Sequence, residues 1–200
     1  MEILFQIIIL IFSAILHEYS HGAMAYSLGD PTAKNAGRLT LNPMAHLDWF
    51  GSVLLPAVMV ISQLPFVFGW AKPVPYNPYL LRDRRFGDAK VAIAGPAANL
   101  AIAVALGLVI RFIPLSIAFV NLLEIAVIIN IVLAIFNLVP LPPLDGSKIL
   151  ASFLSEKWRT KFLSLERFGF VLVILFVMFG ISIIYPLVFA LFRLITGSSI

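Results

Sequence analysis

The amino-acid sequence predicts an all-α polytopic membrane protein with four to five transmembrane helices, a re-entrant element and short extended segments. Apolar residues make up 61% of the 200 positions and charged residues only 12%. A soluble domain carries about twice that fraction of charged residues. The apolar residues also gather in runs long enough to cross a bilayer, which takes about 20 residues. We therefore expect one transmembrane domain over residues 1–200 with few soluble parts.

Five hydrophobic segments are predicted. They cover residues 3–28, about 50–70, about 88–112, about 117–140 and about 168–193. The last of these is expected to be either one span or two half-helices around Pro186. A catalytic core would then occupy about 3–157, followed by the C-terminal span.

The connections carry strong turn and helix-breaking signals. Residues 37–43 are expected to be extended, and the proline-rich stretch 68–78 is expected to be a strand or polyproline-like segment, because closely spaced prolines exclude a regular helix. Prolines at positions 140, 142 and 143 end the fourth segment. A short amphipathic helix is predicted after them, over about 146–157.

The basic residues predict the orientation. If residues 50–78 enter the membrane and return on the same side, 12 of the 14 Lys and Arg residues share one side, and only Arg111 and Arg193 lie opposite. The positive-inside rule then makes that side cytoplasmic. We expect a cell-membrane protein with four full spans, one re-entrant element and an external N-terminus. The net charge of +4 fits contact with an anionic lipid bilayer, and nothing indicates a nucleic-acid partner.

The first segment contains His17-Glu18-Tyr19-Ser20-His21. On a helix the two histidines lie one turn apart on one face, and Glu18 is offset by about 100°. Two imidazoles and a carboxylate are costly in hydrocarbon unless they are paired or hold a ligand. This spacing is typical of a zinc site in which the glutamate poises a water molecule.

A third protein ligand is needed, and the chain has no cysteine. Asp145 stands out because it follows the proline cluster and can reach back into the bilayer; it could also cap the helix after it. Asp48 is a possible alternative, whereas Glu124 is too far away in depth. His46 is expected to be a loop histidine or a hydrogen-bond donor to a ligand, and not a ligand itself. The remaining acidic residues are expected to be solvated in polar loops: Glu2, Asp30, Asp83, Asp88, Glu156 and Glu166.

Three asparagines lie in the apolar segments. Asn137 is equally compatible with an interhelical hydrogen bond and with a functional role. Asn99 and Asn130 are expected to be packing residues.

Several motifs together resemble the site-2 protease family of intramembrane zinc metalloproteases, in its compact bacterial and archaeal form. These are His17-Glu18-x-x-His21-Gly22, Asn137-x-x-Pro140-x-x-Pro143-Leu144-Asp145-Gly146, Gly37-Arg38-x-x-x-Asn42-Pro43, Phe68-Gly-Trp-Ala-Lys72-Pro-Val-Pro75 and Ala94-Gly95-Pro96-x-x-Asn99.

The resemblance implies one zinc ion per chain, held by His17, His21 and Asp145. Glu18 would be the general base and Asn137 a polar neighbour of the reacting carbonyl. The expected substrate is a membrane protein with a locally unwound transmembrane segment, since a helix hides its carbonyl groups. The alternative is a zinc-binding membrane transporter or sensor that cleaves nothing. The absence of internal repeats is unusual for a transporter.

Overall fold

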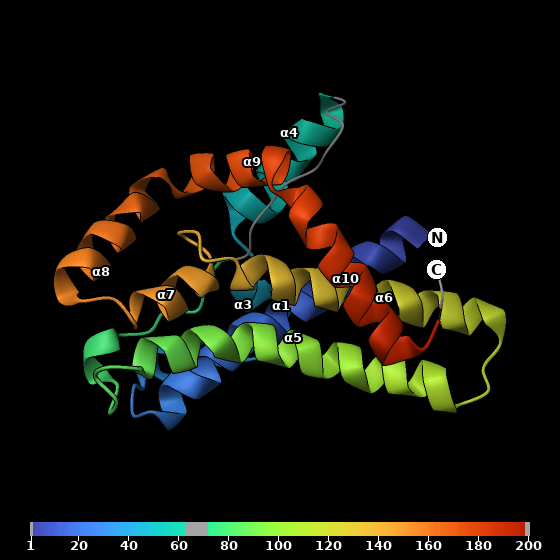
Figure 1. Ribbon diagram of the computed structural model, residues 1–200, viewed down its shortest axis with the longest axis horizontal. Helices are drawn as coiled ribbons and strands as arrows, with labels where there is room; N and C mark the ends of the chain where they lie inside the picture. The colour runs from blue at the N-terminus through green and yellow to red at the C-terminus, as the bar shows by residue number, and fades with distance from the viewer. Residues whose placement is uncertain (1, 63–71, 199–200) are drawn as a thin grey trace.

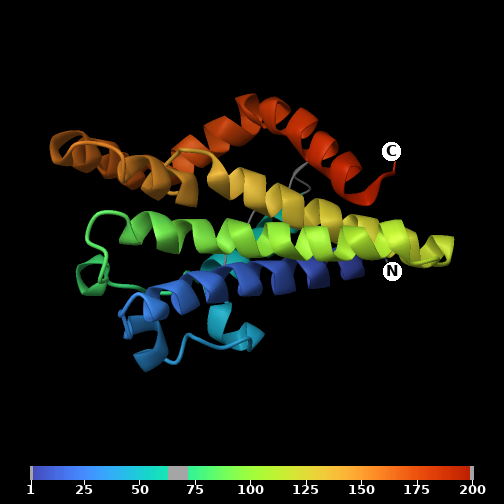
Figure 2. The same cartoon turned by 60° about the horizontal axis from the view of Figure 1, so that its bottom comes forward.

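Three long antiparallel helices form the centre of the molecule. The computed structural model describes residues 2–62 and 72–198. The central helices are α1 (Glu2–Ser27), α5 (Gly87–Phe112) and α6 (Ile117–Leu138). They lie side by side, with α5 between α1 and α6 in the view of Figure 2. The predicted segments 3–28, 88–112 and 117–140 are therefore confirmed as helices.

The region between α1 and α5 consists of short elements. These are α2 (Thr32–Asn35), α3 (Pro43–His46), a π-helical turn η1 (Trp49–Leu54), α4 (Leu55–Ile61) and a 3-10 turn η2 (Pro78–Leu80). No strand occurs among the described residues, and residues 72–77 are irregular. The part of the predicted extended stretch over residues 68–71 lies outside the described residues.

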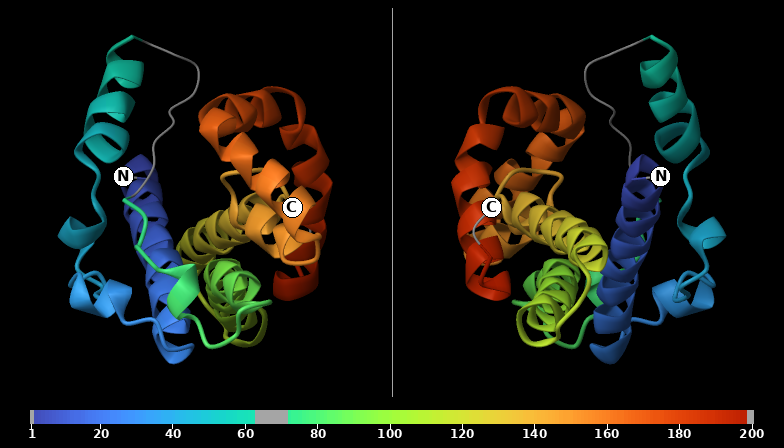
Figure 3. Two further views of the ribbon diagram at one scale, coloured as in Figure 1. Left: turned by 90° about the vertical axis from the view of Figure 1, so that its left-hand side faces the viewer. Right: turned by 90° about the vertical axis from the view of Figure 1, so that its right-hand side faces the viewer.

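The two sides of the predicted re-entrant element meet at one end of the bundle. The backbone N–H of Arg82 donates to Leu28 O at 2.8 Å, and the N–H of Asn77 donates to the Asp30 carboxylate at 2.6 Å. The chain thus leaves and rejoins the bundle where α1 ends and α5 begins, as a returning segment requires. Figure 3 shows α4 on the α1 side, set apart from α10. Part of the predicted segment 50–70 lies outside the described residues.

The C-terminal part differs from the prediction. The described helices are α7 (Asp145–Ala151), α8 (Glu156–Leu163), a 3-10 turn η3 (Ser164–Phe168), α9 (Gly169–Phe179) and α10 (Ile181–Thr196). The helix expected over 146–157 already ends at Ala151. The segment expected over 168–193 is divided at Gly180, whereas Pro186 lies inside α10. A side chain at position 180 would collide with the Phe176 ring, so a glycine permits the bend.

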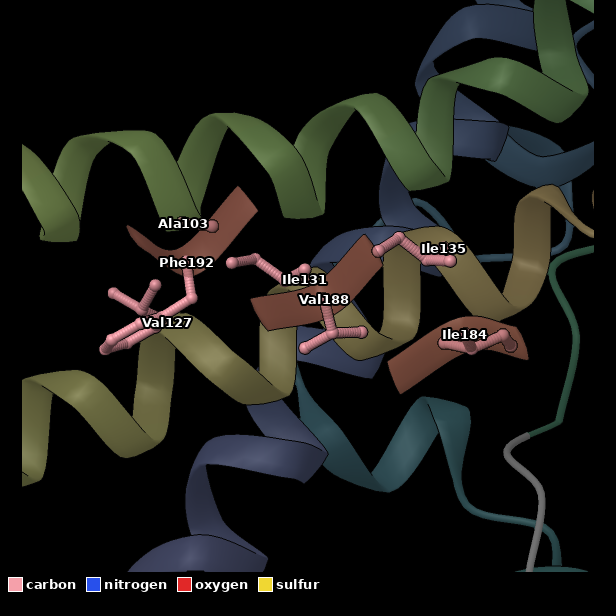
Figure 4. Close-up of a cluster of buried hydrophobic side chains, with 7 residues drawn as sticks. All are labelled: Ala103, Val127, Ile131, Ile135, Ile184, Val188 and Phe192. Atoms are coloured by element: carbon pink, nitrogen blue, oxygen red, sulfur yellow. The ribbon is translucent and has the colours of Figure 1, made fainter. Parts of the chain in front are cut away.

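The C-terminal helix closes the hydrophobic core. Buried side chains of α5, α6 and α10 form one cluster (Figure 4): Ala103, Val127, Ile131, Ile135, Ile184, Val188 and Phe192. Gly107 of α5 allows close approach, since a Cβ there would overlap Ile195. The α9–α10 arm therefore packs back onto the central helices instead of extending away from them (Figure 1).

Four helices in the described part of the chain are long and apolar enough to cross a membrane. They are Leu4–Ser27, Gly87–Phe112, Ile117–Leu138 and the continuous run Glu156–Phe179. Both termini lie at the same end of the bundle (Figure 2). The protein is an all-α polytopic membrane protein, as the sequence predicts.

Candidate metal centre

Two distant parts of the chain meet at one buried cluster. His17 and His21 come from the C-terminal half of α1, and Asp145 is the first residue of α7. Asp145 Oδ2 lies 3.0 Å from His17 Nε2 and 3.1 Å from His21 Nε2. All three side chains are buried, and one potential ligand atom from each lies within 4.8 Å of the others.

The proline-rich turn after α6 places Asp145. Helix α6 ends at Leu138, and a short turn leads directly into α7, which packs beside α5 (Figure 1). Gly146 makes this close return possible, because a Cβ at that position would overlap Leu138 O. The alternative role of Asp145 as the N-cap of this helix is not borne out, because Leu144 is the N-cap residue and no side chain caps α7.

A buried amide network orients His17. Its Nδ1 lies 2.6 Å from Asn99 Oδ1, and Asn99 Nδ2 donates to Ser13 O at 3.2 Å and to Asn130 Oδ1 at 2.9 Å. Asn130 Nδ2 in turn donates to Ser13 Oγ and Ala126 O. Backbone carbonyls only accept, so both amide groups have one possible orientation. His17 therefore carries its proton on Nδ1, and the Nε2 lone pair faces Asp145.

His21 is oriented by the backbone of α5. Its Nδ1 donates to Val91 O at 2.7 Å, which leaves the Nε2 lone pair directed at Asp145. Gly95 lies directly against the two rings: a Cβ there would be 2.5 Å from His21 Nε2 and 2.7 Å from His17 Nε2. Position 95 must therefore be glycine for α5 to pack against the cluster.

The donor set fits a zinc ion. Two imidazole lone pairs and a carboxylate oxygen converge inside an apolar bundle, and each ring already uses its Nδ1 proton elsewhere. Three such acceptors repel one another unless a cation lies between them. Two histidines and an aspartate are common zinc ligands, and hydrogen bonds to the distal ring nitrogens are their usual support.

Glu18 is held by the segment 72–77, which we term the strap. Its Oε2 accepts the backbone N–H of Val74 at 2.8 Å. Buried charges hold both ends of the strap: Arg38 donates to the carbonyls of Lys72 and Pro73, and Asp30 accepts from Asn77. The expectation that Asp30 is solvated is wrong, because its side chain is fully buried.

A cavity of about 160 Å³ opens beside the cluster. All five predicted site residues line it: His17, Glu18, His21, Asn137 and Asp145. Asn137 Nδ2 donates to Leu133 O at 2.9 Å.

Tyr76 and Lys148 complete the polar wall of the cavity. Burial raises the pKa of the Tyr76 phenol above its usual value, so this side chain is protonated at neutral pH. No motif in the sequence indicates a role for either residue.

The other candidates lie elsewhere. His46 Nε2 bonds to Thr40 O at 2.7 Å, and the Asp48 carboxylate accepts from Gly51 N at 2.7 Å. Neither belongs to the metal-binding group found among the described residues. Sequence reasoning missed the roles of Asn99 and Asn130 as the support of His17. Their position inside apolar helices could have indicated this role, because an amide group in such a place is costly unless it has a specific hydrogen-bond partner.

We predict that Asn99→Leu weakens zinc binding about 10- to 100-fold, because His17 loses the acceptor that fixes its tautomer. Competition with a fluorescent zinc chelator in detergent measures the affinity. Asn121→Leu, at an exposed position of α6, is the matched control. Equal affinities in the two variants would show that the amide network does not support the metal site.

Gly95→Ala should abolish stoichiometric zinc binding, because the added methyl group displaces both imidazoles. Ala97→Val adds bulk at an exposed position of the same helix and should retain zinc. Elemental analysis of purified protein gives the zinc content, and the melting temperature in detergent reports folding. A Gly95→Ala variant with full zinc content would contradict the assigned geometry.

Comparisons with known proteins agree with this site. Residues 113–182 match the family model described as Peptidase family M50. The chain is 37% identical to the Bacillus subtilis protein YwhC, named as a candidate zinc metalloprotease, over 92% of this chain and 85% of YwhC. It is 30% identical to the Mycolicibacterium smegmatis protein Rip2, named in the same way, over 81% of this chain and 62% of Rip2.

A shorter match, 36% identical, relates 36% of this chain to 21% of the zinc metalloprotease MJ0392 of Methanocaldococcus jannaschii. No solved structure matches the chain. The similarity to YwhC covers most of both chains, and the buried His-His-Asp group supplies a fitting zinc site. The chain therefore belongs to peptidase family M50, the site-2 protease family, and is a multi-pass membrane metalloendopeptidase with a zinc cofactor.

Proposed function

We propose that this protein cleaves peptide bonds in or near the transmembrane segments of membrane proteins. The observation that carries the proposal is the position of the site: three potential zinc ligands and Glu18 share one cavity between helices that are long and apolar enough to span a bilayer. A peptide bond reaching this cavity would come from a chain that is itself within the membrane.

His17, His21 and Asp145 would hold the zinc ion. When bound, zinc lowers the pKa of a water ligand and polarises the substrate carbonyl. The Nε2 atoms of both histidines face the carboxylate oxygen, so the protein supplies three ligands and leaves further positions to water and substrate.

Glu18 would act as the general base. It follows His17 on α1 and lines the same cavity. The Val74 N–H holds Oε2, which leaves Oε1 to accept a proton from the attacking water. As the carbon–nitrogen bond breaks, Glu18 returns this proton to the departing amine.

Asn137 would bind the carbonyl oxygen of the scissile peptide. The Leu133 carbonyl takes one N–H of its amide, and we assign the second to the substrate. A preorganised donor of this kind stabilises the negative charge that develops on the oxygen.

The substrate would be unwound before cleavage, and the strap is its pairing partner. Exposed peptide groups in a bilayer require hydrogen bonds, which an extended segment can provide by β-augmentation. Two segments were candidates, around 38–42 and 72–77. Pro73, Val74 and Tyr76 line the cavity, whereas none of residues 38–42 does. This favours the strap.

The cavity would open toward the cytoplasm, with the N-terminus outside. The basic loops lie at the end of the bundle where α1 ends and α5 begins, and Arg111 and Arg193 lie near the opposite ends of α5 and α10. Positively charged loops favour the cytoplasmic side.

Cleavage can be tested in liposomes with a single-span reporter whose transmembrane segment carries a central Asn-Gly-Pro interruption. Glu18→Gln should retain zinc and lose at least about 1000-fold in cleavage rate, since the general base is removed. His17→Ala and Asp145→Ala should lose both zinc and cleavage. If Glu18→Gln cleaved the reporter at the wild-type rate, Glu18 would not be the general base. A zinc-loaded wild type that cuts no interrupted reporter would favour a sensor or transporter.

Substrate pairing can be tested by disulfide crosslinking, because the chain has no cysteine of its own. In the Glu18→Gln background, Pro75→Cys should crosslink to a cysteine placed in the reporter beside the interruption. Leu41→Cys, in the other candidate segment, is the control and should remain uncrosslinked. Crosslinking through position 41 alone would transfer the pairing role to residues 38–42.

A further inference from the structure

Lys148 lies on the wall of the proposed catalytic cavity. It follows Asp145 by three positions on α7, and residues three apart occupy the same helix face. Glu18, Asn137 and Asp145 line the same cavity. Among the described residues, Lys148 is the one lysine or arginine side chain in this lining.

Tyr76 of the strap positions the ammonium group. The Lys148 Nζ lies 5.3 Å from the centre of the Tyr76 ring, in cation–π contact. Burial by itself would lower the pKa of the Lys148 ammonium, but the carboxylates of Asp145, Glu166 and Glu18 outweigh that effect, so its pKa is higher than usual and the side chain is charged at neutral pH. A half-buried cation thus lines the same cavity as the proposed general base.

Peptide hydrolysis creates a negative charge in this cavity. Attack of water on the carbonyl carbon moves an electron pair onto the carbonyl oxygen, which is therefore more negative in the transition state than in the bound peptide. A fixed cation stabilises that charge more strongly in a dry cavity than in water.

We propose that Lys148 is a catalytic residue whose ammonium group donates a hydrogen bond to the carbonyl oxygen of the scissile peptide, beside Asn137. The inference rests on the proposed peptidase function. Lys148 keeps its proton throughout: the proton of the attacking water passes through Glu18 to the leaving amine, and the oxygen regains its double bond when the carbon–nitrogen bond breaks.

The first test is steady-state cleavage of the interrupted reporter in liposomes. Lys148→Met should retain zinc and lower kcat about 100-fold or more with little change in KM, because the contact forms in the transition state. Lys148→Arg should recover part of the rate. Lys161→Met, on exposed α8, should behave as wild type.

The second test measures binding and does not depend on turnover. A phosphinic peptide with the reporter's interrupted sequence carries a tetrahedral anion that mimics the transition state. Lys148→Met should bind it at least about 10-fold more weakly than wild type does. The ordinary peptide, which Glu18→Gln leaves uncleaved, should bind the single variant Glu18→Gln and the double variant Glu18→Gln/Lys148→Met equally well.

The outcomes separate the two proposals. Unchanged kcat and phosphinic-peptide affinity in Lys148→Met would overturn the role of Lys148, as would loss of zinc or an equal loss of affinity for both peptides. A wild type that neither cleaves the reporter nor binds the phosphinic peptide would instead overturn the proposed function.

Discussion

The structure depends on the need to satisfy polar groups inside an apolar helix bundle. A polar group buried without a partner costs about 2–7 kcal/mol, and hydrocarbon offers no water to replace one. His17 is satisfied by Asn99, which in turn bonds to Asn130 and to the backbone carbonyl of Ser13. This chain of contacts fixes α1, α5 and α6 relative to one another. The metal-binding cluster and the helix packing are therefore one arrangement, and the bundle is built around the site.

The loops serve the same site with buried charges. Asp30 and Arg38 lie outside the central helices, yet both are buried and both bind the strap. The strap in turn holds Glu18 and forms one side of the cavity. The proposed general base thus comes from a transmembrane helix, and its orientation from a loop. Preorganisation of this kind reduces the reorganisation that the reaction requires.

The cavity collects groups of complementary charge. Its lining includes the acidic Asp145 and Glu18, the basic Lys148 and the polar Tyr76 and Asn137. Zinc, the cofactor, adds a positive charge. Each of these charges is expensive among apolar helices, and their convergence on one small volume suits the proposed hydrolysis of a peptide bond. The family relationship indicates a zinc metalloprotease, and the buried His-His-Asp group supplies a site that fits zinc.

The sequence by itself determined the helical membrane class, three of the long helices, the histidine spacing and the aspartate after the proline cluster. These follow from local hydrophobicity, helix periodicity and the rigidity of proline, which act over a few residues. Only the tertiary structure decided that Asn99 supports His17 and that Asp30 and Arg38 hold the strap. It also decided that Asp145 does not cap α7 and that the last segment bends at Gly180. Each of these depends on side chains that are distant in sequence and are brought together by packing, where the best available partner for a buried polar group cannot be read from its neighbours along the chain.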